Sequence, residues 1–328
     1  MTDQGVCQDC VGEREFAGRV YRSDVRAARK RLAGRVRKTP VFHTSVPGPN
    51  GPVPVTLKLE YLQHGGTFKV RGSFNALLES GAAAEQVVIA SGGNAGIAAA
   101  LAAAQLGKGC TVVAPESAPH TKVAAMWSYG AEVRWHGTTY AEAHEYAAEL
   151  AAQRRALQLH AYDLPAVVAG AGVIGLELEE QVRGRPPVLA AVGGGGLIAG
   201  LAAAFGRRQP VLGVESEGVP ALHAALAARR PVEVRPTGRA AHAPGATRIG
   251  DIALDLACRY GVRSLLVTSD AIVDARDYLW REFRIAVELS GAIALAAVRS
   301  GAYVPARGER PVVVLCSAST DLDMGGAS

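Results

Sequence analysis

Short β-branched runs alternate with alanine-rich stretches along most of this chain, and this alternation limits the possible folds more than any other feature. The first series predicts strand 87–90, helix 95–106, strand 110–114, helix 121–129, strand 131–135 and helix 140–154. A second series begins near Ala166 and includes strands around 188–192, 211–215, 264–267 and 311–315. Strands that alternate with helices form parallel sheets covered by helices. The sequence therefore predicts an α/β protein in two lobes, with two open, twisted, mostly parallel sheets flanked by helices.

The bulk composition is that of a globular protein. The chain has 328 residues, of which 49% are apolar, so it can bury a large core. Its longest smooth apolar run, 95–106, is shorter than the roughly 20 residues that a membrane span needs. The N-terminus lacks the basic-then-apolar pattern of a signal peptide. We therefore expect a cytoplasmic protein with no membrane partner.

The net charge is +5, and much of the positive excess lies between residues 14 and 38. This segment predicts an amphipathic helix capped by Ser23. Its apolar positions at helical spacing are Val25, Ala28, Leu32 and Val36. A nucleic-acid-binding arm is the alternative, but no aromatic or recognition motif accompanies the charge. A solvated helix face is favoured, and no nucleic-acid partner is expected.

The five cysteines, an odd number, are scattered at positions 7, 10, 110, 258 and 316 and form no disulfide framework. Cys7 and Cys10 make a single CxxC motif with no matching second pair. We expect them to lie in a loose polar tail rather than in a zinc or redox site.

Two glycine-rich turns each follow an expected strand and open an expected helix. The first, Ser91–Gly96, presents free backbone N–H groups at the positive end of a helix dipole, which suits a carboxylate or a phosphate. The second contains four consecutive glycines, Gly193–Gly196, whose backbone can wrap a phosphate closely because it carries no Cβ atoms. Neither turn has the pattern of a P-loop or of a dinucleotide-binding turn. Two anion sites are therefore predicted, the second of them for a phosphate.

Lys69 lies in the run Gly65–Ser73, after two strands expected at 39–42 and 53–59 around a loop at 46–52. Most lysines are solvated surface charges, and on its own this lysine would be assigned to that class. A primary amine behind a pair of glycines at a strand end is also placed to form a Schiff base. Together with a phosphate site, such an amine predicts pyridoxal phosphate as the cofactor, bound in the cleft between the lobes.

These motifs resemble those of a known family. TFKVRGSFNAL is similar to the lysine motif, SGGNAG to the substrate-carboxylate loop and GGGGLIAG to the phosphate loop of the fold-type II pyridoxal-phosphate enzymes, in particular the threonine/serine dehydratase and serine racemase group. The resemblance runs from about Ser23 to Thr320 and includes APHTKVAAMWSYGAEVRWHG, AVVAGAGVIGLELEEQV, GVESEGVPALHAAL, VELSGAIALAAV and VVVLCSAST. It implies a fold like that of the tryptophan synthase β subunit. Residues 1–73 and 159–328 would form a large cofactor-binding domain, with a small substrate domain, 74–158, inserted in it. A homodimer is expected.

The resemblance also implies a role for each motif residue. Lys69 is expected to bind the cofactor as a Schiff base and then to remove the α-proton of the substrate. Cys316 is expected beside the pyridine nitrogen, where a neutral thiol does not enforce protonation of the ring and so favours elimination. The remaining expected contacts are Phe68 beside the ring, Asn94 at its 3′-oxygen, Gly193, Gly194, Gly195, Gly196 and Leu197 around the phosphate, and Ser91, Gly92, Gly93 and Asn94 around the substrate carboxylate.

Three departures from the family pattern bear on function. Gly92 stands where serine racemases carry a second catalytic serine, which disfavours racemisation. Glu215 matches the start of the family's divalent-cation site, but the later aspartate is replaced around Ala221, so we expect no metal. AGAGV at 169–173 and CSAS at 316–319 replace a more polar and a more glycine-rich run. These two changes indicate either an altered side-chain pocket or neutral changes in packing.

These expectations favour an ammonia-lyase that dehydrates L-threonine or L-serine to a 2-oxo acid and ammonia. β-Elimination or β-replacement on another β-substituted amino acid is the alternative within the same class. A catalytically silent protein that binds pyridoxal phosphate is the alternative from another class, and the intact Lys69 argues against it.

Overall fold

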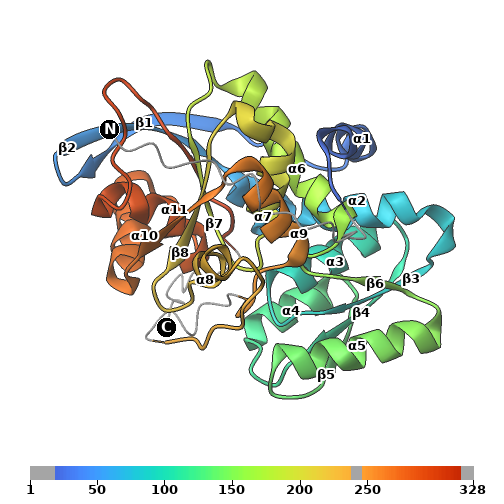
Figure 1. Cartoon of the computed structure of the whole chain (residues 1–328). Helices are drawn as coiled ribbons and strands as arrows, with labels where there is room; N and C mark the ends of the chain where they lie inside the picture. Colours follow the sequence, from blue (N-terminus) through green and yellow to red (C-terminus); the bar gives the residue numbers. More distant parts are fainter. Residues whose placement is uncertain (1–18, 238–245, 319–328) are drawn as a thin grey trace, which may run out of the picture.

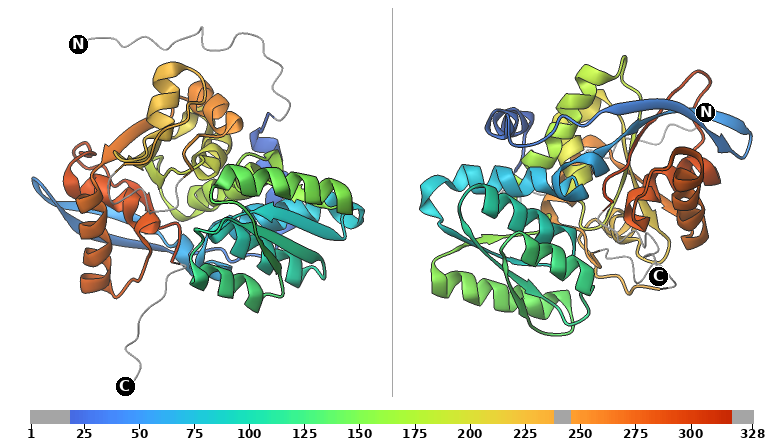
Figure 2. Two further views of the ribbon diagram at one scale, coloured as in Figure 1. Left: turned by 90° about the horizontal axis from the view of Figure 1, so that it is seen from below. Right: turned by 180° about the vertical axis from the view of Figure 1, so that it is seen from behind.

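The computed structural model describes residues 19–237 and 246–318, in which the strands form two separate sheets (Figure 1). One sheet has six strands and the other has four, and helices flank both. The sheets lie in two lobes side by side, the smaller of which is coloured cyan to green (Figure 2). This architecture confirms the predicted α/β class with two mostly parallel sheets.

The six-stranded sheet joins segments from both ends of the described chain. Its strands lie in the order β1 (Val41–Gly48), β2 (Gly51–Lys58), β10 (Val312–Val314), β7 (Val188–Ala191), β8 (Val211–Ser216) and β9 (Arg263–Val267). Among these strands β1 and β2 are antiparallel, and all other neighbours are parallel. Because β10 lies between β2 and β7, the strand that leads to Lys69 is next to the strand that leads to Cys316.

The hairpin of β1 and β2 is longer than predicted. The expected loop at 46–52 is wrong, because the two strands stay paired as far as Gly48 and Gly51. β10 pairs only with Thr56–Lys58 of β2. The part of the hairpin nearer its tip therefore projects beyond the sheet as a two-stranded ribbon. Prolines are tolerated in such a ribbon because an outer edge needs no N–H donor.

Helices cover both faces of the large sheet. α1 (Arg22–Leu32), α6 (Pro165–Gln181), α7 (Gly196–Phe205), α8 (Ala221–Ala228) and α9 (Asp251–Tyr260) share one core, and α10 (Ser269–Phe283) and α11 (Leu289–Ser300) share the other. Alternate residues of β10 enter the two cores, Val312 and Val314 the first and Val313 the second. A strand that is buried on both faces has a continuous apolar sequence, which is why this strand could be predicted.

The predicted N-terminal helix is present as α1, but it ends at Leu32, before Val36. Two of its arginines bind acidic side chains of α6. Arg22 pairs with Glu179 at 2.5 Å and Arg29 pairs with Glu180 at 2.5 Å. Part of the positive charge of this segment is therefore matched within the protein.

The four-stranded sheet is parallel throughout, in the order β5 (Glu132–Trp135), β4 (Gly109–Ala114), β3 (Gln86–Ala90) and β6 (Leu157–Leu159). α2 (Lys69–Ser80), α3 (Asn94–Gln105) and α4 (His120–Ser128) pack on one side, and α5 (Tyr140–Arg154) packs on the other. β6 is not among the predicted strands, because three residues give no recognisable pattern. The domain limits of 74–158 and the remainder stay a prediction.

The alanine-rich helix α3 is buried on nearly every side, from Ala95 to Ala103. It lies between α2, α4 and the small sheet. A helix that is apolar all round has to be covered by other elements, and here the two neighbouring helices and the sheet cover it. Within the described residues, every helix is too short or too polar to span a bilayer.

A buried ionic cluster holds the first turn of α2. Arg71 Nε donates to Glu60 Oε2 at 2.8 Å, and Arg71 Nη1 donates to Glu177 Oε1 at 2.7 Å. Lys58 Nζ donates to the other oxygen of Glu177 at 2.6 Å. Buried charges are tolerated only when they are matched, and here two cations meet two carboxylates. The cluster therefore fixes α2 against β2 and α6 two residues from Lys69.

Candidate active site

Lys69 is the first residue of α2, and its side chain is half-buried. Its Nζ atom donates to the carbonyl oxygen of Ala161 at 3.3 Å and lies 5.2 Å from the centre of the Phe68 ring. Burial lowers the pKa of the Lys69 ammonium group, and the charges of Cys316 and Glu288 only partly oppose this shift. A lowered pKa makes the neutral, nucleophilic amine more available near neutral pH.

The loop before Lys69 is joined to the end of β10. Phe68 N donates to Cys316 O at 3.1 Å, and Ala318 N donates to Gly66 O at 2.8 Å. These bonds place Cys316 beside the lysine loop, as expected for two segments that follow neighbouring parallel strands. Burial raises the pKa of the Cys316 thiol to about 12, so the thiol is neutral at physiological pH. The Sγ atom lies 3.4 Å from the carbonyl oxygen of Ser290.

The turn between β3 and α3 is held by the side chain of Ser91. Its Oγ atom accepts from Gly93 N at 3.1 Å and from Gly96 N at 2.9 Å. At Gly92, a Cβ atom would lie 2.7 Å from the Cβ atom of Ala118, which is too close for a real contact. At Gly93 the space is open. The turn is therefore closed on the side of Gly92 and open on the side of Gly93.

Asn94 is the first residue of α3, and its amide group contacts two charged side chains. Asn94 Nδ2 donates to Glu288 Oε1, and Lys122 Nζ donates to Asn94 Oδ1 at 2.8 Å. Lys122 also pairs with Glu288 Oε2 at 2.9 Å. Burial alone would raise the pKa of Glu288, but Lys122, Ser317 and Asn94 together hold it below its ordinary value. Glu288 is therefore a carboxylate in the cleft.

The tetraglycine turn lies between β7 and α7. Gly195 has a φ angle of +91°, a left-handed conformation that side chains disfavour. A Cβ atom at Gly194 would lie 2.3–2.4 Å from ring atoms of Tyr162. The Tyr162 ring therefore lies directly against the backbone of the turn. Leu197 follows in the first turn of α7 and is buried.

The segment 160–163 connects the lysine to the tetraglycine turn. Ala161 supplies the carbonyl oxygen that accepts from Lys69, and the next residue, Tyr162, covers Gly194. Burial raises the pKa of the Tyr162 hydroxyl to about 12. This segment was not predicted as part of the site, because it carries none of the motifs and is brought to the cleft only by the path of the chain between β6 and α6.

His160 and Asp163 hold this segment in place. His160 Nδ1 accepts from Asp163 N at 2.8 Å, and the Asp163 carboxylate accepts from Asp251 N and Ile252 N, both at 3.0 Å, at the start of α9. Burial lowers the pKa of His160 to about 4, and His144, Lys69 and Arg248 add to this effect. His160 is therefore neutral, with Nδ1 as an acceptor.

The structure brings the predicted site residues together where the two lobes meet. The bonds described above connect the lysine loop to Cys316, the Asn94 amide to Glu288 beside it, and the tetraglycine turn to Lys69 through Ala161 and Tyr162. The assigned role of each residue stays a prediction. Lys122 and Glu288 were overlooked, although both lie in stretches that carry the family resemblance, APHTKVAAMWSYGAEVRWHG and VELSGAIALAAV.

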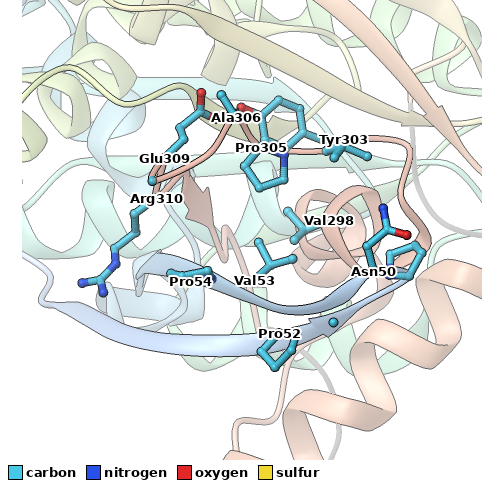
Figure 3. A pocket seen from close by; sticks show the side chains of 14 residues that line it. Asn50, Pro52, Val53, Pro54, Val298, Tyr303, Pro305, Ala306, Glu309 and Arg310 are labelled. Atoms are coloured by element: carbon cyan, nitrogen blue, oxygen red, sulfur yellow. Dashed lines mark hydrogen bonds between the residues drawn. The ribbon is translucent and has the colours of Figure 1, made fainter.

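Other features lie away from this cleft. A pocket between the β1–β2 hairpin and the loop before β10 is lined by Pro52, Val53, Tyr303 and Glu309, among others, and contains no predicted site residue (Figure 3). Glu215 accepts from the backbone N–H groups of Leu222 and His223, so it caps α8. No cluster of metal ligands occurs among the described residues. Cys7 and Cys10 lie outside them.

Comparisons with known proteins identify the family of this chain. The family model of pyridoxal-phosphate dependent enzymes matches residues 32–317. The chain is 32% identical over 306 residues to the L-threonine ammonia-lyase of Thermotoga maritima, covering 92% of this chain and 76% of that protein. It is 34% identical over 283 residues to the catabolic L-threonine dehydratase of Escherichia coli, covering 85% of this chain and 86% of that protein.

Solved structures show the same fold. Maize serine racemase superposes with a TM-score of 0.84 at 26% identity, covering 92% of this chain and 94% of that chain. The T.th. threonine deaminase superposes with a TM-score of 0.80 at 31% identity, covering 92% of this chain and 99% of that chain. The matched family model spans most of the sequence, including the lysine loop and both glycine-rich turns. This chain belongs to the family of pyridoxal-phosphate-dependent enzymes.

Proposed function

We propose that the protein is a pyridoxal-phosphate-dependent ammonia-lyase that dehydrates L-threonine, L-serine or both to a 2-oxo acid and ammonia. Relatives named L-threonine ammonia-lyase or dehydratase are 32–36% identical to it. The observation that carries the proposal is the arrangement around Lys69. One amine of lowered pKa faces the cleft, and the turn that would carry a second acid or base has no room for a side chain at Gly92.

The residues of the cleft fit the cofactor. The Gly193–Gly196 turn lacks Cβ atoms and opens α7, so its backbone N–H groups and the helix dipole suit a phosphate. Cys316 offers a neutral thiol to a pyridine nitrogen, and Phe68 offers an apolar ring surface next to Lys69. Lys69 would hold the aldehyde group of the cofactor and would become a free amine when the amino group of the substrate takes its place. When bound, pyridoxal phosphate supplies an electron sink for the carbon atom that bears the amino group.

The chain's own residues then perform three tasks. The turn Ser91–Asn94 receives the carboxylate of the amino acid at the N-terminus of α3. Ser91 keeps this turn in shape through its bonds to Gly93 and Gly96. Lys69, as a neutral amine, takes the proton from the α-carbon on one face. The β-hydroxyl then leaves with a proton as water, and hydrolysis of the released enamine gives the 2-oxo acid and ammonia.

A racemase needs an acid or base on each face of the α-carbon, and this distinguishes the two activities found among the structural relatives. In serine racemases a serine fills the position of Gly92. Here a Cβ atom at Gly92 would lie 2.7 Å from Ala118 Cβ and 3.3 Å from Ala118 Cα. A serine would therefore require the loop at Ala118 to move. We infer that elimination is favoured over racemisation.

The finer points of the proposal are a covalent bond between Lys69 and the cofactor, a homodimer and a cytoplasmic location. Another β-substituted amino acid remains the second candidate substrate.

The test is a scan of amino acids against the purified protein with pyridoxal phosphate. L-Threonine or L-serine is expected to give a 2-oxo acid and an equal amount of ammonia without an added nucleophile. Lys69→Ala is the inactive control, and Lys108→Ala, on the small lobe away from the cleft, is the active one. Two results would contradict the proposal. One is turnover by Lys69→Ala, and the other is the formation of a new β-substituted amino acid with an added nucleophile but no 2-oxo acid without one.

A further inference from the structure

Three polar side chains bridge the two lobes at the cleft. Asn94 begins α3 and Lys122 lies in the first turn of α4, both in the small lobe, whereas Glu288 precedes α11 in the large lobe. Lys122 Nζ lies 2.8 Å from Asn94 Oδ1 and 2.9 Å from Glu288 Oε2, and Asn94 Nδ2 completes the triangle by donating to Glu288 Oε1. One ammonium group therefore joins the substrate turn to the opposite lobe.

The position of Lys122 is electrostatically unusual. A cation near the N-terminus of a helix is opposed by the helix dipole, and Lys122 is near the N-termini of both α3 and α4. Its side chain is only 12% exposed and that of Glu288 only 14% exposed, so solvent screens the pair weakly. Local rules of this kind are most often broken at functional sites.

The triangle continues to the residues around Cys316. The hydroxyl of Ser317 helps to hold the pKa of Glu288 low and lies 3.1 Å from the hydroxyl of Ser290. Cys316 Sγ lies 3.4 Å from the carbonyl oxygen of Ser290. Ser317 therefore lies near both the Glu288 carboxylate and the thiol predicted beside the cofactor ring.

We propose that Lys122 is a positioning residue: it sets the distance between the Ser91–Asn94 turn and the Glu288–Cys316 side of the cleft, and so orients Asn94 toward the cofactor. This rests on the proposed function only in so far as the cleft binds pyridoxal phosphate. Lys122 itself need not touch the substrate. Its effect is transmitted through the amide of Asn94 and the carboxylate of Glu288.

The test compares the affinity of the full-length, cofactor-free protein for pyridoxal phosphate, measured by fluorescence titration, across five variants. Lys122→Met removes the charge and keeps the chain length, whereas Lys122→Arg keeps the charge. Glu288→Gln removes the charge of the other partner in the Lys122–Glu288 pair. The double variant completes a double-mutant cycle, which measures the coupling between the two residues. Lys108→Met is the control, because Lys108 Nζ bonds Gly81 O and Ala84 O within the small lobe.

A dissociation constant about tenfold higher for Lys122→Met is expected, since hydrogen bonds of charged groups are lost. Lys122→Arg should stay within about threefold of the parent and Lys108→Met should equal it. The double variant should be no weaker than the weaker single variant. A merely structural role would lower the melting temperature of Lys122→Met without changing the dissociation constant.

The proposal is overturned if Lys122→Met binds the cofactor as tightly as the parent, or if the effects of Lys122→Met and Glu288→Gln multiply in the double variant. These titrations do not depend on turnover. If the parent releases no 2-oxo acid from threonine or serine, the proposed function fails while the role of Lys122 is still decided.

Discussion

Two lysines within about a dozen positions of each other have opposite surroundings. Lys58 is fully buried, and its Nζ atom donates to Thr39 O at 2.7 Å, Glu177 Oε2 at 2.6 Å and Gln181 Oε1 at 2.9 Å. Lys69 is half-buried, and within the described part of the chain its Nζ atom donates to Ala161 O at 3.3 Å. Burial lowers the pKa of both ammonium groups.

The two lysines differ in the groups that oppose this effect of burial on the pKa. For Lys58 the opposing charges belong to Glu60 and Glu177, and Glu177 is in direct contact. For Lys69 the opposing groups are Cys316, whose thiol is neutral at physiological pH and so supplies no charge there, and Glu288, which is already paired with Lys122. A well-matched ammonium group can stay buried and charged, and its removal leaves a carboxylate partner unmatched. A poorly matched one costs stability but leaves an amine that can react.

The largest expected effect is that of Lys69→Met on turnover. Loss of the amine should reduce kcat by at least about a thousandfold, the scale of a missing general base and covalent anchor. With the cofactor removed, the melting temperature should equal or exceed that of the parent, because a poorly matched buried charge is replaced by an apolar chain of similar length. Turnover assays and thermal melts check the two parts. A clear fall in the melting temperature would show that Lys69, like Lys58, is a structural lysine.

Lys58→Met should have the opposite outcome. Removing one cation leaves Glu177 with an unmatched part of its charge in the core, which costs about 3–5 kcal/mol of folding free energy. Activity per folded molecule should remain close to that of the parent, because Lys58 does not face the cleft. Denaturant unfolding and active-site titration measure the two quantities. If Lys58→Met is as stable as the parent, the buried cluster does not anchor α2 as the structure implies.

The contrast between the two lysines shows how far sequence alone could reach. Lys69 was identified because two glycine-rich turns elsewhere in the chain predicted anion sites, and an amine together with a phosphate site indicates pyridoxal phosphate. Lys58 lies in a predicted strand between Leu57 and Leu59 and was not singled out. Its partners Glu60 and Glu177 come from η1 (Glu60–Leu62) and from α6, and only the folded chain brings them together.

The same reason explains the other omissions. Periodicity revealed the strands that are buried on both faces, but not β6, which has three residues, nor the full length of the hairpin, whose outer part pairs with one neighbour only. Tyr162 and Ala161 carry no motif, because one acts through ring contact and the other through its backbone. Contacts of this kind depend on the path of the chain and leave no signature in residue type.

Gly194→Ala tests the surroundings of Lys69, because it would displace Tyr162, the residue next to Ala161, whose carbonyl oxygen accepts from Lys69. The new methyl group would overlap the Tyr162 ring, and moving this ring displaces the adjacent Ala161 carbonyl. Overpacking of this kind costs about 1–3 kcal/mol, so the dissociation constant of pyridoxal phosphate should rise by about tenfold or more. Gly109→Ala is the control, since a Cβ atom there would meet only the exposed side chain of Gln86, at 3.3 Å or more. Equal cofactor affinity in both variants would mean that Tyr162 does not fix the tetraglycine turn.

The smallest expected effect is a pH dependence of stability that arises beside Lys69. The pKa of His160 is about 4 in the folded protein, chiefly through burial, against about 6.5 for an exposed histidine. The folded state therefore resists a proton that the unfolded state accepts. The stability that His160 contributes is complete above about pH 6.5 and is lost as the pH falls toward 4.

His160→Asn isolates this contribution, because the asparagine Oδ1 can accept from Asp163 N as Nδ1 does but does not titrate. The melting temperature of the parent should fall by about 3 °C more than that of His160→Asn between pH 7.5 and pH 5. Thermal melts at a series of pH values measure this difference. Parallel curves for the two proteins would mean that His160 takes up a proton without cost. In that case Lys69 would face a histidine that can become charged at low pH, and this second cation would lower the pKa of the Lys69 ammonium group beyond the effect of burial.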